Sequence, residues 1–297
     1  MRSIGVTIPT LVGGGLIEPF AWGSDAPTAA AVDGTVSVGP AARPFTLADA
    51  SGTSSSAFAA MFEKIKLLDG LLPEQNYWPP VATGAQPKAQ LFDFGDGGNL
   101  ENYGLIPLLM RGVKKIVVFI NTETPMSTSY DPTIGTVTNN DMDSSFPPLF
   151  GIPFSSGGDP TLAVNQVFSS NDFAPVVQAL QAKKKAGQPL VTSYTHTIQP
   201  NPWWGVPGSG TVEVLYVYLD QVQSWRNLLT DEWVKIQLDL GDAGEFPHFP
   251  NYKTIDENIF PPWGLTELTA RQVNLLADLT CWVITQSGDV IKKFLAS

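Results

Sequence analysis

The residue pattern best suited to chemistry is an aspartate followed by two glycines, Asp96-Gly97-Gly98. A short apolar strand is predicted over residues 89–94, so Asp96 would lie at the carboxyl end of a strand, where α/β proteins bind ligands. Gly97 and Gly98 can adopt the positive φ of a sharp turn and let a ligand approach the backbone. A carboxylate placed in this way can act as the base that activates a serine. The alternative is a glycine-rich turn that Asp96 caps.

The candidate for that serine is Ser54, in the run Gly52-Thr53-Ser54-Ser55-Ser56. The run is similar to a nucleophile elbow in which Ser replaces the last glycine, although the elbow needs that glycine for close packing of helix on strand. We therefore favour the alternative, in which Ser54 caps a helix predicted over residues 57–72. The chain contains no G-x-S-x-G pattern.

Two histidines and several acidic loop residues are the other candidates. Either His196 or His248 could complete a Ser-His-Asp triad, but we interpret both as structural. The acidic residues of 139–143 and 157–159 lack the spacing of an EF-hand, so they predict solvated loops, and we expect neither a metal nor a cofactor. The lone Cys281 excludes an internal disulfide and is expected to be buried.

Composition limits the class of partner. The 297 residues carry 17 Lys and Arg against 28 Asp and Glu, a net charge of −11. This balance argues against nucleic acid, whose affinity comes from cationic contacts with phosphate, and against a polybasic grip on anionic lipid. No apolar run is long enough for a transmembrane segment. The single cysteine and the lack of a signal-peptide pattern favour the cytoplasm.

Hydrophobic periodicity predicts the elements that must position these residues. We expect strands and ordered loops before residue 57, a Pro-rich loop over 73–88, and a long functional or covering loop over 122–170. Helices are expected over 57–72, within 100–111, and over 172–186, 221–229, 266–286 and 289–295; strands are expected over 89–94, 115–121 and 211–219. Strand, helix and buried strand over 89–121 would form a βαβ unit. We therefore expect an α/β fold over 1–297: one domain with a mostly parallel sheet, helices on both faces and long loop insertions.

One block resembles a known family. Residues 94–109, followed by Arg111-Gly112-Val113 and an apolar strand, are similar to the catalytic-aspartate segment of cytosolic phospholipase A and fungal phospholipase B, relatives of patatin. Asp96 matches that family's aspartate and Asn102 its asparagine. The segments 18–24 and 51–58 and the C-terminal helix are also similar to the family in their order.

The resemblance implies a patatin-like fold and a lipid acyl hydrolase that cleaves an ester of a phospholipid or lysophospholipid by a Ser–Asp dyad. Asp96 would accept the proton of the serine, while Gly97, Gly98 and Asn102 would shape the turn. In the family the serine lies in G-x-S-G-[GS], upstream of the segment that Glu18 begins, so we expect this chain to be the C-terminal part of such an enzyme. Two alternatives are an inactive binding or assembly module derived from the family, and a nucleophile at Ser54.

Overall fold

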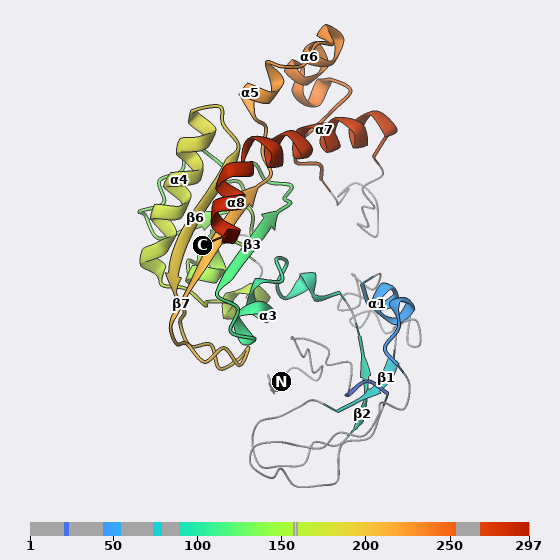
Figure 1. Cartoon of the computed structure of the whole chain (residues 1–297), viewed down its shortest axis with the longest axis vertical. Coiled ribbons are helices and arrows are strands. Elements are labelled where there is room, and N and C mark those ends of the chain that lie inside the picture. Colours follow the sequence, from blue (N-terminus) through green and yellow to red (C-terminus); the bar gives the residue numbers. More distant parts are fainter. Residues whose placement is uncertain are drawn as a thin grey trace. The chain divides into compact units, whose positions relative to one another are not determined.

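The computed structural model describes residues 21–23, 44–54, 74–78, 89–94, 96–156, 158, 160–253 and 268–296. The chain divides into two compact units (Figure 1). Unit 1 comprises residues 1–111 and 200–207, and unit 2 comprises residues 112–199 and 208–297. The helix expected over 57–72 lies outside the described residues, and a single domain over 1–297 stays a prediction.

Unit 1 contains a small antiparallel hairpin. Strand β1 (Glu74–Tyr77) pairs with β2 (Gln90–Asp93), with Glu74 opposite Asp93. A core of aromatic residues packs beside the hairpin: Ala21, Trp22, Tyr77 and Trp78 are buried, and Phe45, Phe92 and Phe94 pack against them. The Trp22 and Phe94 rings lie 4.4 Å apart, so the core reaches the residue that precedes the Asp96 turn by two positions.

Three expectations for unit 1 are wrong. Helix α1 (Leu47–Ser54) occupies part of the segment expected to lack helices. Thr46 and Asp49 cap its N-terminus, because the side chain of each accepts a hydrogen bond from the backbone N–H of the other. Strand β1 lies in the expected Pro-rich loop, and β2 pairs with β1 rather than forming a βαβ unit with the apolar strand after residue 114.

Unit 2 is built on a three-stranded sheet in the order β3-β7-β6. The central strand β7 (Thr211–Tyr218) runs parallel to β3 (Lys115–Ile120) and antiparallel to β6 (Leu190–Thr197). Helix α3 (Leu105–Met110) precedes Arg111, the last residue of the N-terminal part of unit 1, and a short parallel pair, β4 (Val137–Thr138) and β5 (Phe154–Ser156), lies in the long loop of unit 2. The described strands therefore form two parallel and two antiparallel pairs, and the fold is α/β.

Different helices cover the two faces of this sheet (Figure 1). Helix α4 (Phe173–Lys185) packs along β6, and its first residue joins an aromatic cluster with Phe146, which contacts Tyr216 of β7. On the other face, Leu215 and Val217 of β7 pack against Phe294 of α8 (Gly288–Ala296). Strand β3 is not buried on both faces as expected, because 53% of Phe119 is exposed.

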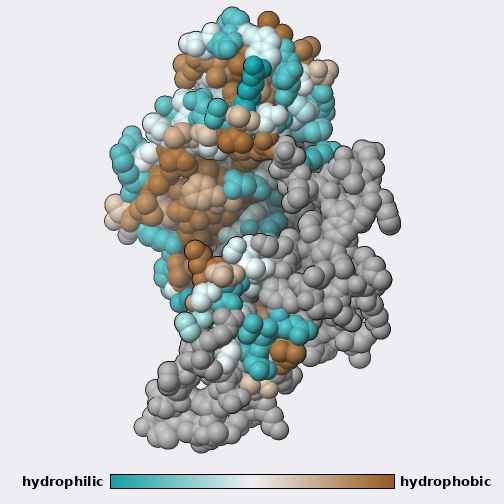
Figure 2. All heavy atoms as spheres, turned by 90° about the vertical axis from the view of Figure 1, so that its right-hand side faces the viewer, coloured by the Kyte–Doolittle hydropathy of each residue, from teal (hydrophilic) through white to brown (hydrophobic). Residues whose placement is uncertain are grey.

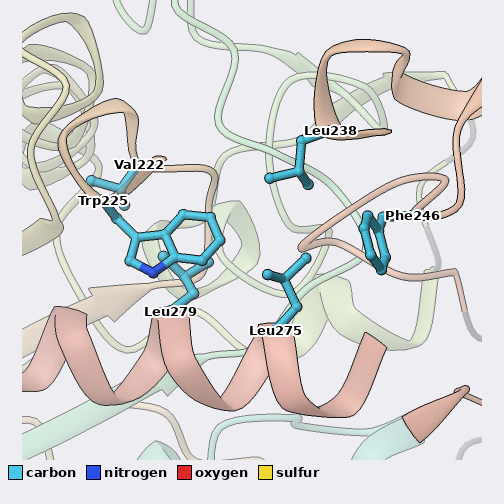
Figure 3. Close-up of a cluster of buried hydrophobic side chains, with 6 residues drawn as sticks. All are labelled: Val222, Trp225, Leu238, Phe246, Leu275 and Leu279. Carbon is cyan, nitrogen blue, oxygen red and sulfur yellow. The ribbon is translucent and has the colours of Figure 1, made fainter. Parts of the chain in front are cut away.

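The other helices of unit 2 form a second hydrophobic cluster, which Figure 3 shows. Leu275 and Leu279 of α7 (Ala270–Gln286) point toward aromatic and aliphatic side chains from α5 (Gln223–Arg226), α6 (Glu232–Asp239) and the loop after α6. The indole N–H of Trp225 donates to Asp278 of α7 at 2.9 Å, so a polar contact fixes α5 on α7 beside the apolar ones.

Several helix and strand predictions in unit 2 are confirmed. The structure has α4, β7, α7 and α8 where periodicity indicated them, and Thr269 and Gln272 form a capping box at the start of α7. Strand β6 and helix α6 were not predicted, and Cys281 is exposed rather than buried because its position on α7 faces away from the cluster of Figure 3.

The surface of unit 2 keeps several large apolar side chains exposed, among them Leu228, Trp233, Ile236 and Leu240. Figure 2 shows hydrophobic patches, in brown, between polar ones on the side it displays. Within the described ranges, none of the helices combines the length and apolarity that crossing a membrane requires.

Candidate functional site

The Asp96 turn follows β2 directly, as expected. Asp96 has extended backbone angles and begins a 3₁₀ turn, Gly97–Asn99. Its Oδ1 accepts a hydrogen bond from the N–H of Gly98 at 2.8 Å, which is the capping role considered as the alternative. The side chain is half-buried, and among the described residues we find no hydrogen bond to its Oδ2. The bond to Oδ1 therefore holds the carboxylate against the backbone of the turn.

The positive φ expected at the two glycines of the turn is wrong. Neither Gly97 nor Gly98 has a positive φ. At Gly98 the constraint is steric, because an added Cβ would lie 2.7 Å from Oδ1 of Asn102 and 3.3 Å from Oδ1 of Asp96. At Gly97 a Cβ would meet nothing within 4 Å. Asn102 thus lies against the turn, close to Gly98 and Asp96.

Glu101 is a further charged group of this turn that sequence reasoning missed. Its Oε1 accepts a hydrogen bond from the N–H of Tyr103 at 2.8 Å, while its buried Oε2 has no hydrogen-bond partner among the residues that the structure describes. Burial raises the pKa of the Glu101 carboxyl, and the nearby N–H groups at the start of α3 partly oppose this. The available signal was its position, four residues before the helix begins, where a carboxylate favours the helix N-terminus.

Ser54 does not have the geometry of a nucleophile elbow. It is exposed and forms the last residue of α1, whereas an elbow places its serine between a strand and the start of a helix. The cap that we expected Ser54 to provide for residues 57–72 lies outside the described residues. The neighbouring Thr53 is buried, and its hydroxyl has no hydrogen-bond partner among the described residues.

His196 lies in the core of unit 2, in a fully satisfied network. The ring is fully buried; Nδ1 lies 3.0 Å from Asp172 Oδ2, and Nε2 lies 2.8 Å from the hydroxyl of Tyr216. Burial lowers the pKa of His196, while Asp172 opposes the shift, so the ring is neutral at pH 7. A neutral ring that donates through Nδ1 accepts the Tyr216 hydroxyl hydrogen at Nε2, which leaves nothing for a substrate.

His248 lies in an exposed loop of unit 2. Its Nδ1 lies 3.1 Å from Asp242 Oδ1, and its backbone N–H donates to the same oxygen at 3.0 Å. The acidic loop over 139–143 makes local hydrogen bonds, since Asp141 Oδ2 accepts hydrogen bonds from both the N–H and the hydroxyl of Thr138. In the part of the chain that the structure describes, no three His, Cys, Asp or Glu side chains converge as metal ligands.

Comparison with protein-family models, with curated proteins and with solved structures finds no match to this chain. The site is therefore judged on its own geometry and on the sequence pattern around Asp96.

Proposed function

We propose that this chain carries the aspartate of a Ser–Asp lipid acyl hydrolase with a patatin-like fold, acting on a carboxylic ester of a phospholipid or lysophospholipid. One observation carries the proposal: Asp96 directly follows a strand, with Oδ1 held by the Gly98 N–H and Oδ2 outside that bond. The block over 94–119, which resembles the family's aspartate segment, supports the same assignment.

The proposed chemistry needs a serine from outside the residues of this chain. Oδ2 of Asp96 accepts the serine hydroxyl proton while the serine oxygen bonds to the ester carbonyl carbon. The tetrahedral intermediate then collapses, and the alcohol leaves with the proton that Asp96 took up. Water hydrolyses the acyl-serine with Asp96 again acting as base, so no proton or electron is left unaccounted for.

The second candidate is a binding or assembly module without activity. It is favoured by the capping bond of Asp96, which a purely structural turn would also make. The exposed position of Ser54 at the end of α1 is also consistent with a chain that has no nucleophile of its own. The two candidates differ in whether a serine reacts.

A fluorophosphonate probe, which labels activated serines covalently, separates the candidates. The full product of the natural gene would be labelled, digested and mapped by mass spectrometry. We expect the label on a serine in a G-x-S-G-[GS] pattern, and its loss in Asp96→Asn but not in the matched control Asp93→Asn. A label on Ser54 would overturn the assignment of the nucleophile to another segment, and a folded protein without any label would support the inactive module.

A further inference from the structure

A cavity of about 480 Å³ lies in unit 2, at the carboxyl ends of the parallel strands β3 and β7. Glu123 comes from the loop after β3, and Asp220 follows β7 directly. Helix α4 contributes Lys184, and the loop after α6 contributes His248 and neighbouring residues. Ligands of α/β proteins bind at this edge of the sheet, and the volume is in the range of small-molecule sites.

Asn251 fixes the floor of the cavity. Its amide donates to the carbonyl of Thr122 at 3.0 Å and to that of Leu219 at 2.9 Å, the residues just beyond β3 and β7. The side chain is almost fully buried, and both of its amide hydrogens are used in this way. The other polar atom of the side chain is Oδ1, which is a hydrogen-bond acceptor.

Lys184 and Asp220 neutralise each other in the wall. Lys184 Nζ donates to both carboxylate oxygens of Asp220, at 2.7 and 2.9 Å, and the N–H groups of Met126 and Gln221 donate to the same carboxylate. Burial raises the pKa of Asp220, while Lys184 and these N–H groups oppose the shift. The carboxylate is thus occupied and offers a ligand neither a free charge nor a free oxygen lone pair in good geometry.

The remaining charge of the wall is negative. Glu123 and Asp242 also line the cavity, and among the described residues that line it no second lysine or arginine offsets their charge. Asp242 Oδ1 lies 3.1 Å from Nδ1 of His248, so the imidazole ring lies beside this carboxylate at the cavity wall. The cavity therefore presents acceptors and negative charge from several sides.

An aromatic surface accompanies these acceptors. Phe249 lines the cavity, and its ring stacks on Trp225 at 5.5 Å with 26° between the planes. Trp225 belongs to the hydrophobic cluster of Figure 3, and Phe249 packs against this cluster. The face of an aromatic ring attracts cations, and its edge accommodates methylene groups.

We propose that this cavity binds a small organic cation, a protonated aliphatic amine, through Glu123, Asp242, Asn251 and Phe249. The ammonium group would donate to Asn251 Oδ1 and lie among the carboxylates of Glu123 and Asp242, with its carbon chain against Phe249. The net charge of −11 would favour the approach of such a ligand. A bare divalent cation is the weaker candidate, because no three ligating side chains converge among the described residues.

Isothermal calorimetry with putrescine tests the proposal on the natural protein, with butanediol, of equal chain length but uncharged, as the ligand control. We expect saturable binding of putrescine only, weakened at least about tenfold in Asp242→Asn and in Glu123→Gln, which is about 1.4 kcal/mol. The matched variant Asp289→Asn, which removes the same charge from the exposed start of α8, should bind as the parent does.

Three results would overturn the proposal: no saturable binding of putrescine, equal binding of butanediol, or equal weakening in Asp289→Asn. Binding of inorganic phosphate in place of putrescine would also do so, since it would mean that the cavity is effectively positive. Amide hydrogen exchange of β3 and β7 in each variant checks that unit 2 stays folded. Asp96 plays no part in this binding, so Asp96→Asn should leave it unchanged, and failure here would not bear on the hydrolase proposal.

Discussion

The buried pair Lys184–Asp220 allows a quantitative test of how unit 2 is held together. In Lys184→Met the volume of the side chain is nearly kept, but Asp220 loses its counter-charge. Two unit charges 2.7 Å apart attract by roughly 6 kcal/mol at an effective dielectric constant of about 20. Lys184 keeps 26% of its side chain exposed, and the N–H groups of Met126 and Gln221 remain. We therefore expect a loss of about 3 kcal/mol, at the lower end for broken buried pairs.

The pH dependence of this loss follows from the same contacts. Without Lys184, the pKa of Asp220 rises further, so the folded variant favours the protonated carboxyl more strongly than the unfolded chain does. Its stability is then fully present below the ordinary pKa of an aspartate and is lost as the pH rises through the raised value. The difference from the parent should accordingly be larger at about pH 7.5 than at about pH 4.

Hydrogen exchange of peptides from α4 and β7 during urea unfolding measures this loss in unit 2 alone. The matched control is Lys185→Met, the next residue of α4, which is exposed. Equal losses in Lys184→Met and Lys185→Met, or a loss that does not depend on pH, would refute the reasoning. In that case the pair would be a surface contact rather than a buried one.

Three further predictions concern packing and the Asp96 turn. Leu279→Ala should cost about 3 kcal/mol in urea unfolding, because Leu279 is fully buried in the cluster of Figure 3, whereas the exposed Val273→Ala on the same helix should cost less than about 0.5 kcal/mol. Gly98→Ala should cost about 1 kcal/mol by the same assay and Gly97→Ala less, since only at Gly98 does a Cβ meet close neighbours. Burial raises the pKa of Glu101, so its contribution to the stability of the parent falls as the pH rises from about 4 toward 7. The melting temperature of Glu101→Gln should therefore rise relative to that of the parent over this range, and a difference that does not change with pH would contradict this.

The elements that the sequence predicted correctly are those with long, regular patterns. Helices α4, α7 and α8 carry an apolar stripe at helical spacing, and the segment of β7 has alternating residues with two tyrosines. Strand β6 was not predicted because residues Thr192 to Thr197 are mostly polar. Its partly apolar pattern becomes clear only from the packing of β6 against β7 and α4. Helix α1 was not predicted because its apolar pattern is weak, although Thr46 and Asp49 are a local signal for the start of a helix.

The pairing between strands could not be predicted from the sequence for a different reason. Strand β2 and the following apolar strand β3 are each recognisable, but nothing local shows that β2 pairs with β1 while β3 pairs with β7, nearly a hundred residues later. The same holds for the cavity. Glu123, Lys184, Asp220 and His248 lie far apart in the chain, and only the ends of β3 and β7 bring them together. The residues of the Asp96 turn, by contrast, lie within seven positions of the sequence, so a local pattern could single out Asp96, Gly97, Gly98 and Asn102 together, and their catalytic role stays a prediction.

The central claim is that the carboxylate of Asp96 serves as a catalytic base. Its most direct test is the rate of lysophospholipid hydrolysis by the full product of the natural gene and by its Asp96→Asn and Asp93→Asn variants, each checked for folding by circular dichroism. The account predicts clear hydrolysis in the parent and in Asp93→Asn, and a loss of at least about a hundredfold in Asp96→Asn with the fold intact. Hydrolysis that persists in Asp96→Asn, or that is absent from a folded parent, would contradict the account.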